Sequence, residues 1–319
     1  MDFVLFSAVA LSGIVFLILV VSLVCFFMVF YSSNRVKNSG NDMPDIPGTE
    51  YDAYKSQIYQ WVTDTRALPH TEVSTLSYDG LKLYGKLYQF EEGAPIEIMI
   101  HGYKGSAERD MSGGVFRAFA LGHSALVIDQ RASGKSDGRV ITFGVKESQD
   151  CLSWVHYVIE HIDADAKIIL TGISMGAATV MNASVLSLPE NVVGILADCG
   201  YTSAQAIIKK VIKDMKLSPK ILYPFVKLGA MVFGRFNPDR VSPIKAMPQC
   251  KLPIIFFHGD SDNFVPFDMS RENFESCSSV KKKLVITPGA GHGLCFPTDQ
   301  QAYLDELGPF FESVLNERK

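Results

Sequence analysis

The stretch IILTGISMGAATV, residues 168–180, decides the fold of this chain. An apolar run of strand length leads into Gly172-Ile173-Ser174-Met175-Gly176, and small residues with helical character follow. A Gly-x-Ser-x-Gly turn between a strand and a helix is a nucleophile elbow, in which the glycines relieve crowding around a strained serine. The stretch therefore predicts a reactive Ser174 that stands clear of the end of a buried strand.

Apolar runs alternate with helical patterns on both sides of this turn. A hairpin is predicted around Asp79-Gly80, with strands at 73–78 and 81–90. The remaining predicted strands are 96–100, 125–129, 167–172, 192–198, 252–258 and 283–287. Several of them are too apolar to have a solvent-facing side, which indicates a mostly parallel sheet covered by helices on both faces. The expected fold class is α/β, with a short amphipathic helix at 51–66 before the sheet.

A serine nucleophile needs a base, and the base needs a carboxylate that orients it. Among seven histidines, only His292 combines a position after the last strand with a glycine-flanked loop, from which an imidazole can reach Ser174. Asp262 follows the preceding strand, and the order Ser174, Asp262, His292 is the one this architecture uses. Asp260 and Asp198 are competing acids.

From about residue 70 onward the chain resembles the α/β-hydrolase superfamily, in particular its membrane-anchored, serine-aminopeptidase-like members. The matching motifs are His-Gly-Tyr at 101–103, Asp-Gln-Arg-x-x-Gly-x-Ser at 129–136, Gly-x-Ser-x-Gly at 172–176, His-Gly-x-x-Asp-x-x-Val-Pro at 258–266 and Gly-His-Gly at 291–293. The resemblance implies that Asp262, rather than Asp260, is the triad acid. It also implies that the backbone N–H groups of Tyr103 and Met175 face the oxyanion, and that no metal or organic cofactor is required. Ser133 departs from the pattern, since relatives often carry His there, in a mostly structural loop.

Residues 3–31 form an uninterrupted apolar segment, in which 25 of 29 positions are hydrophobic and none is charged. As a helix it would be about 43 Å long, enough to cross the ~30 Å hydrocarbon core of a bilayer with tilt. It lacks the preceding positive charge and the following cleavage site of a signal peptide. We predict a single-pass membrane anchor, a polar linker at 32–50 and a hydrolase domain at 51–319. Because Arg35 and Lys37 follow the anchor, the positive-inside rule places this domain in the cytoplasm.

The anchor accounts for most of the hydrophobic character of the chain, whose mean hydropathy is +0.14 over 319 residues. No later stretch approaches the ~20 apolar residues of a second span, which excludes a polytopic transporter. The net charge of −4 gives no general electrostatic footprint for nucleic acid. Five cysteines lie outside the anchor without C-x-x-C spacing, so they are predicted to be small core residues rather than disulfides or zinc ligands.

About fifty residues separate the strand ending near 198 from the next, and we assign 201–245 to an inserted helical cap. The cap carries nine basic and two acidic residues, so its formal net charge is +7, while that of the rest of the chain is −11. It contains no Glu to hold a substrate's ammonium group, and it suits an acyl chain, an anionic lipid-like ester or an anionic membrane surface. An ordinary solvated lysine face is the alternative. The residues predicted to line an acyl pocket, unless they only pack in the cap, are Leu222, Tyr223, Phe225, Leu228, Met231 and Phe233.

These observations predict a membrane-tethered serine hydrolase that cleaves a carboxyl ester or thioester. Its expected partners are a small-molecule acyl substrate and membrane lipid, without nucleic acid. A peptidase or amidase is the enzymatic alternative. A catalytically silent hydrolase fold that serves as a membrane scaffold is the alternative from another class, and the complete set of triad residues argues against it.

Overall fold

One sheet of eight strands, in the order β1-β2-β4-β3-β5-β6-β7-β8, organises the molecule. We describe it from a computed structural model that covers residues 2–33 and 43–316. The strands are β1 Thr71–Leu76, β2 Lys82–Tyr88, β3 Ile96–Ile100, β4 Ser124–Asp129, β5 Ile168–Ile173, β6 Val192–Asp198, β7 Ile254–Gly259 and β8 Lys282–Thr287. All neighbours from β4 to β8 are parallel, while β2 runs antiparallel to both β4 and β1. This confirms the mostly parallel sheet and the hairpin at its edge.

Helices cover both faces of the sheet, as the apolar strands require. One face packs against α4 Glu147–His161, α5 Met175–Ala183 and α9 Phe267–Ser276. The other face packs against α3 Ala107–Ala120 and α11 Gln300–Asn316. The shorter elements are η1 Thr49–Tyr51, α2 Lys55–Ala67, α8 Pro243–Ala246, η2 Met247–Gln249 and α10 Cys295–Thr298. The amphipathic helix expected at 51–66 is thus present as η1 followed by α2.

The eight expected strands are all present, and each of their ends differs from the prediction by two residues or fewer. The six cysteines are buried and free in the part of the chain that is described, as expected of core residues. Residues 34–42 of the expected linker lie outside the described residues.

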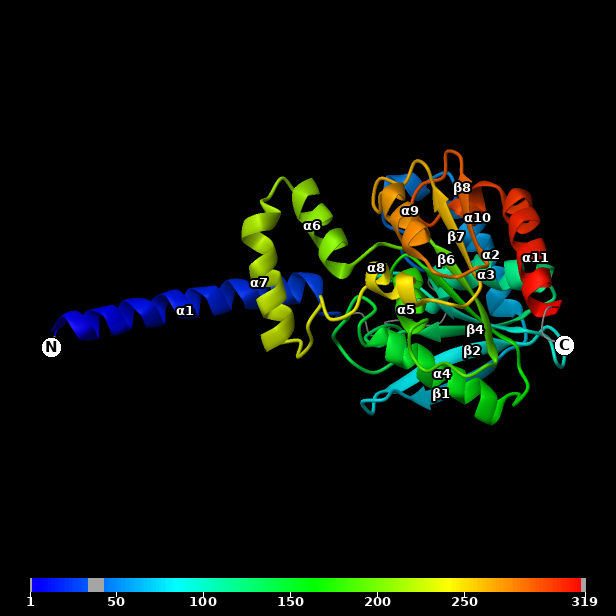
Figure 1. The fold of residues 1–319 in the computed structure, drawn as a ribbon, viewed down its shortest axis with the longest axis horizontal. Helices are drawn as coiled ribbons and strands as arrows, with labels where there is room; N and C mark the ends of the chain where they lie inside the picture. Colours follow the sequence, from blue (N-terminus) through cyan, green and yellow to red (C-terminus); the bar gives the residue numbers. More distant parts are fainter. Residues whose placement is uncertain (1, 34–42, 317–319) are drawn as a thin grey trace.

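Two helices in the range assigned to the cap, α6 Ala204–Asp214 and α7 Pro219–Val232, stand away from the sheet (Figure 1). Ser203 caps the first of them, since its side chain accepts a hydrogen bond from the N–H of Ala206 at 3.0 Å. The N-terminal helix α1, Asp2–Val29, crosses α7 and extends beyond it, away from the sheet (Figure 1). A Cβ added at Gly229 of α7 would lie 2.3 Å from the carbonyl oxygen of Ser22. Glycine is therefore what allows the two backbones to touch.

Helix α1 is long and apolar enough to cross a membrane over Leu5–Val29, and it is the one such helix in the described residues. Its first part is exposed, whereas Ser22, Cys25 and Phe26 are buried against the cap. The helix ends at Val29, two residues before the expected end of the apolar segment. Tyr31 instead pairs with Val140 in an antiparallel bridge, because the chain turns there onto the hydrolase domain.

Candidate active site

Ser174 occupies the sharp turn between β5 and α5. Its backbone has φ 55° and ψ −114°, a conformation that L-residues rarely adopt, and it is the strained geometry expected of a nucleophile elbow. The N–H of Ser174 donates to the carbonyl oxygen of Asp198 at 2.8 Å, which ties the turn to β6. Glycine is required on both sides, since an added Cβ would lie 2.2 Å from the Gly176 backbone at Gly172 and 1.9 Å from the Ile100 oxygen at Gly176.

The structure brings Ser174, His292 and Asp262 into one hydrogen-bonded chain, although they come from three separate loops. The Ser174 hydroxyl lies 2.8 Å from Nε2 of His292, and Nδ1 of His292 lies 2.7 Å from Oδ2 of Asp262. With the ring proton on Nδ1, the serine donates to Nε2 and the histidine donates to the carboxylate. This order of donors is what removal of the serine proton by imidazole requires.

Asp262 is held as a buried carboxylate by several donors. Its Oδ1 accepts the N–H groups of Phe264 and Val265, both at 2.8 Å, and its Oδ2 lies 3.2 Å from Nε2 of His258. Burial by itself raises the pKa of Asp262, but the hydrogen bonds from His258 and His292 outweigh it and hold the pKa well below its usual value. The group is therefore an anion at neutral pH.

His258 is the supporting residue that the sequence did not single out for this role. It is fully buried, with Nδ1 2.6 Å from the Ser270 hydroxyl and Nε2 2.8 Å from the carbonyl oxygen of Val265. These contacts fix the ring beside Asp262. The signal in the sequence was its place four residues before the acid, in the same strand-end motif.

The two competing acids lie elsewhere. Asp260 is exposed, and its Oδ1 accepts the N–H of Gly289 at 2.7 Å, so it braces the loop before His292. Asp198 is buried and accepts a hydrogen bond from the Tyr303 hydroxyl at 3.1 Å, and burial raises the pKa of its carboxyl.

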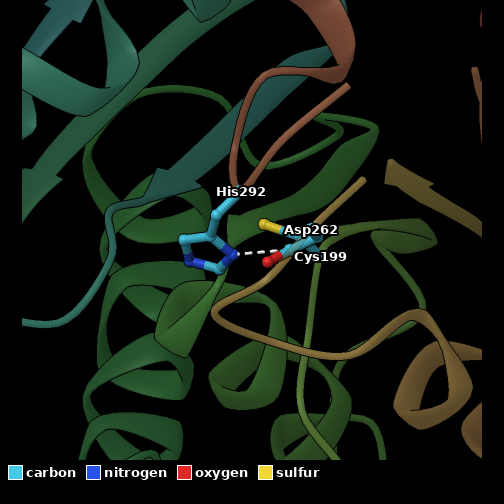
Figure 2. A group of neighbouring side chains, drawn as sticks. All are labelled: Cys199, Asp262 and His292. Carbon is cyan, nitrogen blue, oxygen red and sulfur yellow. Dashed lines mark hydrogen bonds and ion pairs between the residues drawn. The ribbon is translucent and has the colours of Figure 1, made fainter. Parts of the chain in front are cut away.

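Cys199 lies beside the acid and the base (Figure 2). Ligand atoms of Cys199, Asp262 and His292 lie within 4.8 Å of one another, and this is the one group of its kind in residues 2–33 and 43–316. Both ring nitrogens of His292 are already hydrogen-bonded, and burial raises the pKa of the Cys199 thiol well above its usual value. The arrangement therefore suits a neutral thiol packed beside an acid–base pair rather than a metal centre.

The predicted oxyanion donors lie on either side of Ser174. Met175 is the first residue of α5, so its N–H has no intrahelical acceptor. Tyr103 follows Gly102, where an added Cβ would lie 3.6 Å from the Cβ of Ser174. Asp110 holds this loop by accepting the Gly102 N–H at 3.0 Å. The loop of Tyr103 and the start of α5 therefore both lie next to the serine, and their role as oxyanion donors stays a prediction.

The loop of Tyr103 is also joined to the end of α1. The Tyr103 hydroxyl donates to the carbonyl oxygen of Val29 at 2.6 Å, and the Lys104 ammonium donates to that of Met28 at 3.2 Å. The last carbonyl groups of a helix have no intrahelical donor, and these side chains supply one. Ser133, the departure from the family pattern, donates to the Gly105 oxygen at 2.6 Å and braces the same loop.

A cavity of about 340 Å³ opens beside Ser174 and His292. Its apolar walls come from the segment before α2, from α2 itself, from β6 and from α10, and they include Ile46, Ile58, Trp61, Leu196 and Phe296. The ring of Trp61 stacks on that of Phe296, with centroids 5.5 Å apart. The cavity thus lies on the α2 and α3 side of the site.

The six cap residues predicted to line an acyl pocket are not in the wall of this cavity, and that prediction differs from the structure. Leu222, Tyr223, Phe225 and Phe233 pack in the cluster that includes the end of α1. Leu228 is half-buried and Met231 is exposed. The physical reason is that α1 covers the apolar face of α7, for example through Phe26 against Phe233, with ring centroids 6.0 Å apart.

Known proteins resemble this chain in sequence and in fold. Protein bem46 of Schizosaccharomyces pombe is 28% identical over 211 residues, which cover 63% of this chain and 62% of that protein. The uncharacterized protein YqkD of Bacillus subtilis is 21% identical over 195 residues, or 61% and 64% of the two chains. The chain thus spans less than two thirds of either relative. The solved esterase Pf2001 of Pyrococcus furiosus shares the fold, with a TM-score of 0.67 and 21% identity over 89% of this chain and 98% of that one.

The expectation of the α/β-hydrolase superfamily is therefore confirmed by fold as well as by motif. The model of the prolyl oligopeptidase family matches residues 142–318, a range that includes Ser174, Asp262 and His292. Because this match covers more than half of the chain, the protein belongs to the prolyl oligopeptidase family, and it has the α/β-hydrolase fold.

Proposed function

We propose that this protein is a membrane-anchored hydrolase that cleaves the carboxyl ester or thioester of an acyl, lipid-like substrate. The observation that carries the proposal is the hydrogen-bonded chain from Ser174 through His292 to Asp262. His292 takes the serine proton as Ser174 attacks the carbonyl carbon, and Asp262 stabilises the imidazolium that forms. The N–H groups of Tyr103 and Met175 bind the oxyanion, each contributing about 3–4 kcal/mol to the transition state. The imidazolium gives its proton to the leaving alcohol or thiol as the ester or thioester bond breaks, and water then hydrolyses the acyl-enzyme with His292 again as the base.

The wall of the cavity supports an acyl substrate. Isoleucine, leucine and aromatic side chains form a large part of it, and burial of an apolar chain against them is favourable at about 25 cal/mol per Å². A peptidase or amidase is the second candidate, because Glu50 gives the wall a carboxylate that would pair with a substrate ammonium. Turnover of acyl esters compared with aminoacyl arylamides separates the two, and faster amide hydrolysis would reject the ester proposal.

The catalytic role of the site is tested by labelling with a fluorophosphonate probe. The folded full-length chain is expected to react, and Ser174→Ala and His292→Ala are expected not to. Ser313→Ala is the matched control, since this serine is exposed on α11 and takes no part in the site. An unlabelled wild-type protein with intact tertiary structure would favour the scaffold function instead.

The arrangement of α1 and the cap supports membrane anchoring. The part of α1 that precedes its contact with the cap, from Asp2 to Val20, is about 28 Å long, close to the ~30 Å of the hydrocarbon core. The cap would then lie at the headgroup level. Its exposed apolar side chains, Met215, Leu217, Ile221, Met231 and Val232, would contact lipid there, while Lys213, Lys216 and Lys220 are exposed for anionic headgroups.

The cytoplasmic location of the hydrolase domain stays a prediction from the positive-inside rule. It is tested by adding protease to intact cells and to permeabilised cells. Protection in intact cells and digestion after permeabilisation are expected. Digestion of the domain in intact cells would place it on the opposite side.

A further inference from the structure

The end of helix α1 lies against the loop between β3 and α3, which carries the backbone N–H group of Tyr103. The Tyr103 hydroxyl donates to the carbonyl oxygen of Val29 at 2.6 Å, and the Lys104 ammonium donates to that of Met28 at 3.2 Å. Both carbonyl groups belong to the last turn of α1, where the helix itself supplies no donor. Two consecutive residues of the loop are thus bonded to two consecutive residues of the helix.

The same loop has a backbone conformation that must be held by its surroundings. Lys104 has φ 50°, in the left-handed region that residues other than glycine rarely adopt. The two sides of the loop are fixed by other groups, since Gly102 donates its N–H to Asp110 at 3.0 Å and the oxygen of Gly105 accepts from Ser133 at 2.6 Å. The bonds to α1 hold the two residues in between.

Aromatic packing joins the same helix end to the same loop. The ring of Tyr103 packs on that of Phe143, with centroids 4.9 Å apart, and Phe143 packs on Phe30 at 5.7 Å. Phe30 follows α1 directly, and both phenylalanine side chains are buried. The carbonyl oxygen of Phe30 also accepts the N–H of Ile141 at 2.8 Å. A displacement of the helix end would therefore move the packing partners of the Tyr103 ring as well as the acceptor of its hydroxyl group.

The cap fixes where the end of α1 lies, because α7 crosses the helix in close contact (Figure 1). An added Cβ at Gly229 of α7 would lie 2.3 Å from the carbonyl oxygen of Ser22, and Cys25 and Phe26 are buried in the cluster that α1 forms with the cap. Ser22 precedes Val29 by two helical turns, about 10 Å along the axis. The docking of α1 on α7 therefore sets the position of Val29 beside the loop.

We propose that the docked end of α1 is a positioning element of the active site, in which the carbonyl groups of Met28 and Val29 hold the loop of Tyr103 where its N–H binds the oxyanion. The proposal rests on the proposed function, because it needs that N–H to be an oxyanion donor. Such donors act at about 2.7–3.1 Å from the oxyanion, so a small shift of the loop weakens them. The hydrolase thus reaches its full rate only with its own membrane helix docked on the cap. The effect falls on kcat rather than on KM, since the oxyanion exists only after Ser174 has attacked.

The first test changes the loop in the full-length chain in detergent. Tyr103→Phe removes the hydrogen bond to Val29 and keeps the ring on Phe143, and it is expected to lower kcat for ethyl hexanoate about fivefold with KM nearly unchanged. Hexyl trifluoromethyl ketone supplies the second readout. Ser174 adds to its carbonyl carbon, the serine proton passes to His292, and the carbonyl oxygen becomes an oxyanion, so its inhibition constant should rise by about the same fivefold. Tyr78→Phe, exposed beside the hairpin turn, is the matched control that keeps both values.

The second test displaces α1 itself. Gly229→Leu pushes α1 away from α7 and is expected to lower kcat at least about fivefold. Gly13→Leu is the matched control, because an added Cβ at this position of α1 has open space around it. In the double variant with Tyr103→Phe, kcat is expected to equal that of Gly229→Leu alone, since the hydrogen bond to Val29 is already broken. The first test decides by itself if Gly229→Leu does not fold.

Two results would overturn the proposal. One is a wild-type inhibition constant for the ketone in Tyr103→Phe, whether or not kcat falls, because the oxyanion donor would then be unaffected. The other is a double variant in which the two single losses multiply, because the helix and the loop would then act independently. Either result leaves the proposed function standing if the wild type hydrolyses ethyl hexanoate and reacts with the fluorophosphonate. Absence of both reactions would instead reject the esterase function and this proposal with it.

Discussion

Replacement of Gly176 by Ala probes how closely the nucleophile turn is fitted to the sheet. The new Cβ would lie 1.9 Å from the carbonyl oxygen of Ile100, 2.7 Å from its carbonyl carbon and 2.9 Å from the oxygen of His101. All three atoms belong to the backbone of β3 and its continuation, so no side-chain rotation can relieve the contact.

The size of the effect follows from how far the 1.9 Å contact lies below the shortest distance that a Cβ tolerates. Contacts of a Cβ below 3.0 Å essentially do not occur, so the start of α5 and the strand must separate by about 1.1 Å, the difference between 3.0 and 1.9 Å. A misplacement of about 1 Å in a reacting group costs on the order of 10²-fold in rate, or about 2.7 kcal/mol in activation free energy. Overpacking also lowers the free energy of unfolding by about 1–3 kcal/mol.

The assay combines kcat for ester hydrolysis with thermal unfolding of the detergent-solubilised chain. Gly308→Ala on α11 is the matched control, because its added Cβ meets Leu121 at 3.4 Å, an ordinary contact, and alanine favours a helix by up to about 1 kcal/mol. We expect Gly308→Ala to keep wild-type kcat and stability or to gain some stability. Wild-type kcat and unfolding temperature in Gly176→Ala would refute the close fit of α5 against β3.

Four further predictions concern the acid, the oxyanion loop and the cap. Asp262→Asn is expected to lower kcat by about 10⁴, because the amide favours the wrong His292 tautomer; single-turnover ester kinetics measure it. Since the folded-state pKa of Asp262 is depressed, its stabilisation is present above the unfolded pKa of about 3.9 and is lost as the pH falls below it. The stability difference between wild type and Asp262→Asn, from unfolding at pH 7 and at about pH 3, should therefore shrink in acid. Tyr103→Phe loses the hydrogen bond to Val29, worth about 1 kcal/mol, and should lower kcat about fivefold with KM nearly unchanged. Ser203→Ala removes the N-cap hydrogen bond of α6 and should lower the free energy of unfolding of the protein by about 1 kcal/mol, measured by thermal unfolding.

Local pattern was enough to predict the sheet and the order of the site residues. Apolar runs of strand length are buried on both faces wherever helices cover a parallel sheet, so 96–100 and 192–198 correspond closely to β3 and β6. Gly-x-Ser-x-Gly predicts its own turn because only glycine fits where the backbone of α5 meets that of β3. The loops after β7 and β8 then carry Asp262 and His292 to the same edge of the sheet as Ser174.

The role of the cap was harder to predict, because composition does not reveal what covers an apolar face. Leu222 and Phe233 have the character of pocket residues, yet α1 packs on them and the cavity opens on the opposite side of the site. The place of His258 four residues before the acid did not by itself reveal that its buried ring would lie beside Asp262.

The sequence by itself determined the fold class, the nucleophile turn and a helix apolar enough to cross a bilayer, because each depends on residues that are neighbours along the chain. Only the tertiary structure decided which carboxylate lies against His292 and where the substrate cavity opens. It also brought the end of α1 into contact with the loop of Tyr103. These features depend on contacts between residues far apart in sequence. Such contacts are fixed by the packing of whole helices against the sheet, which no local pattern records.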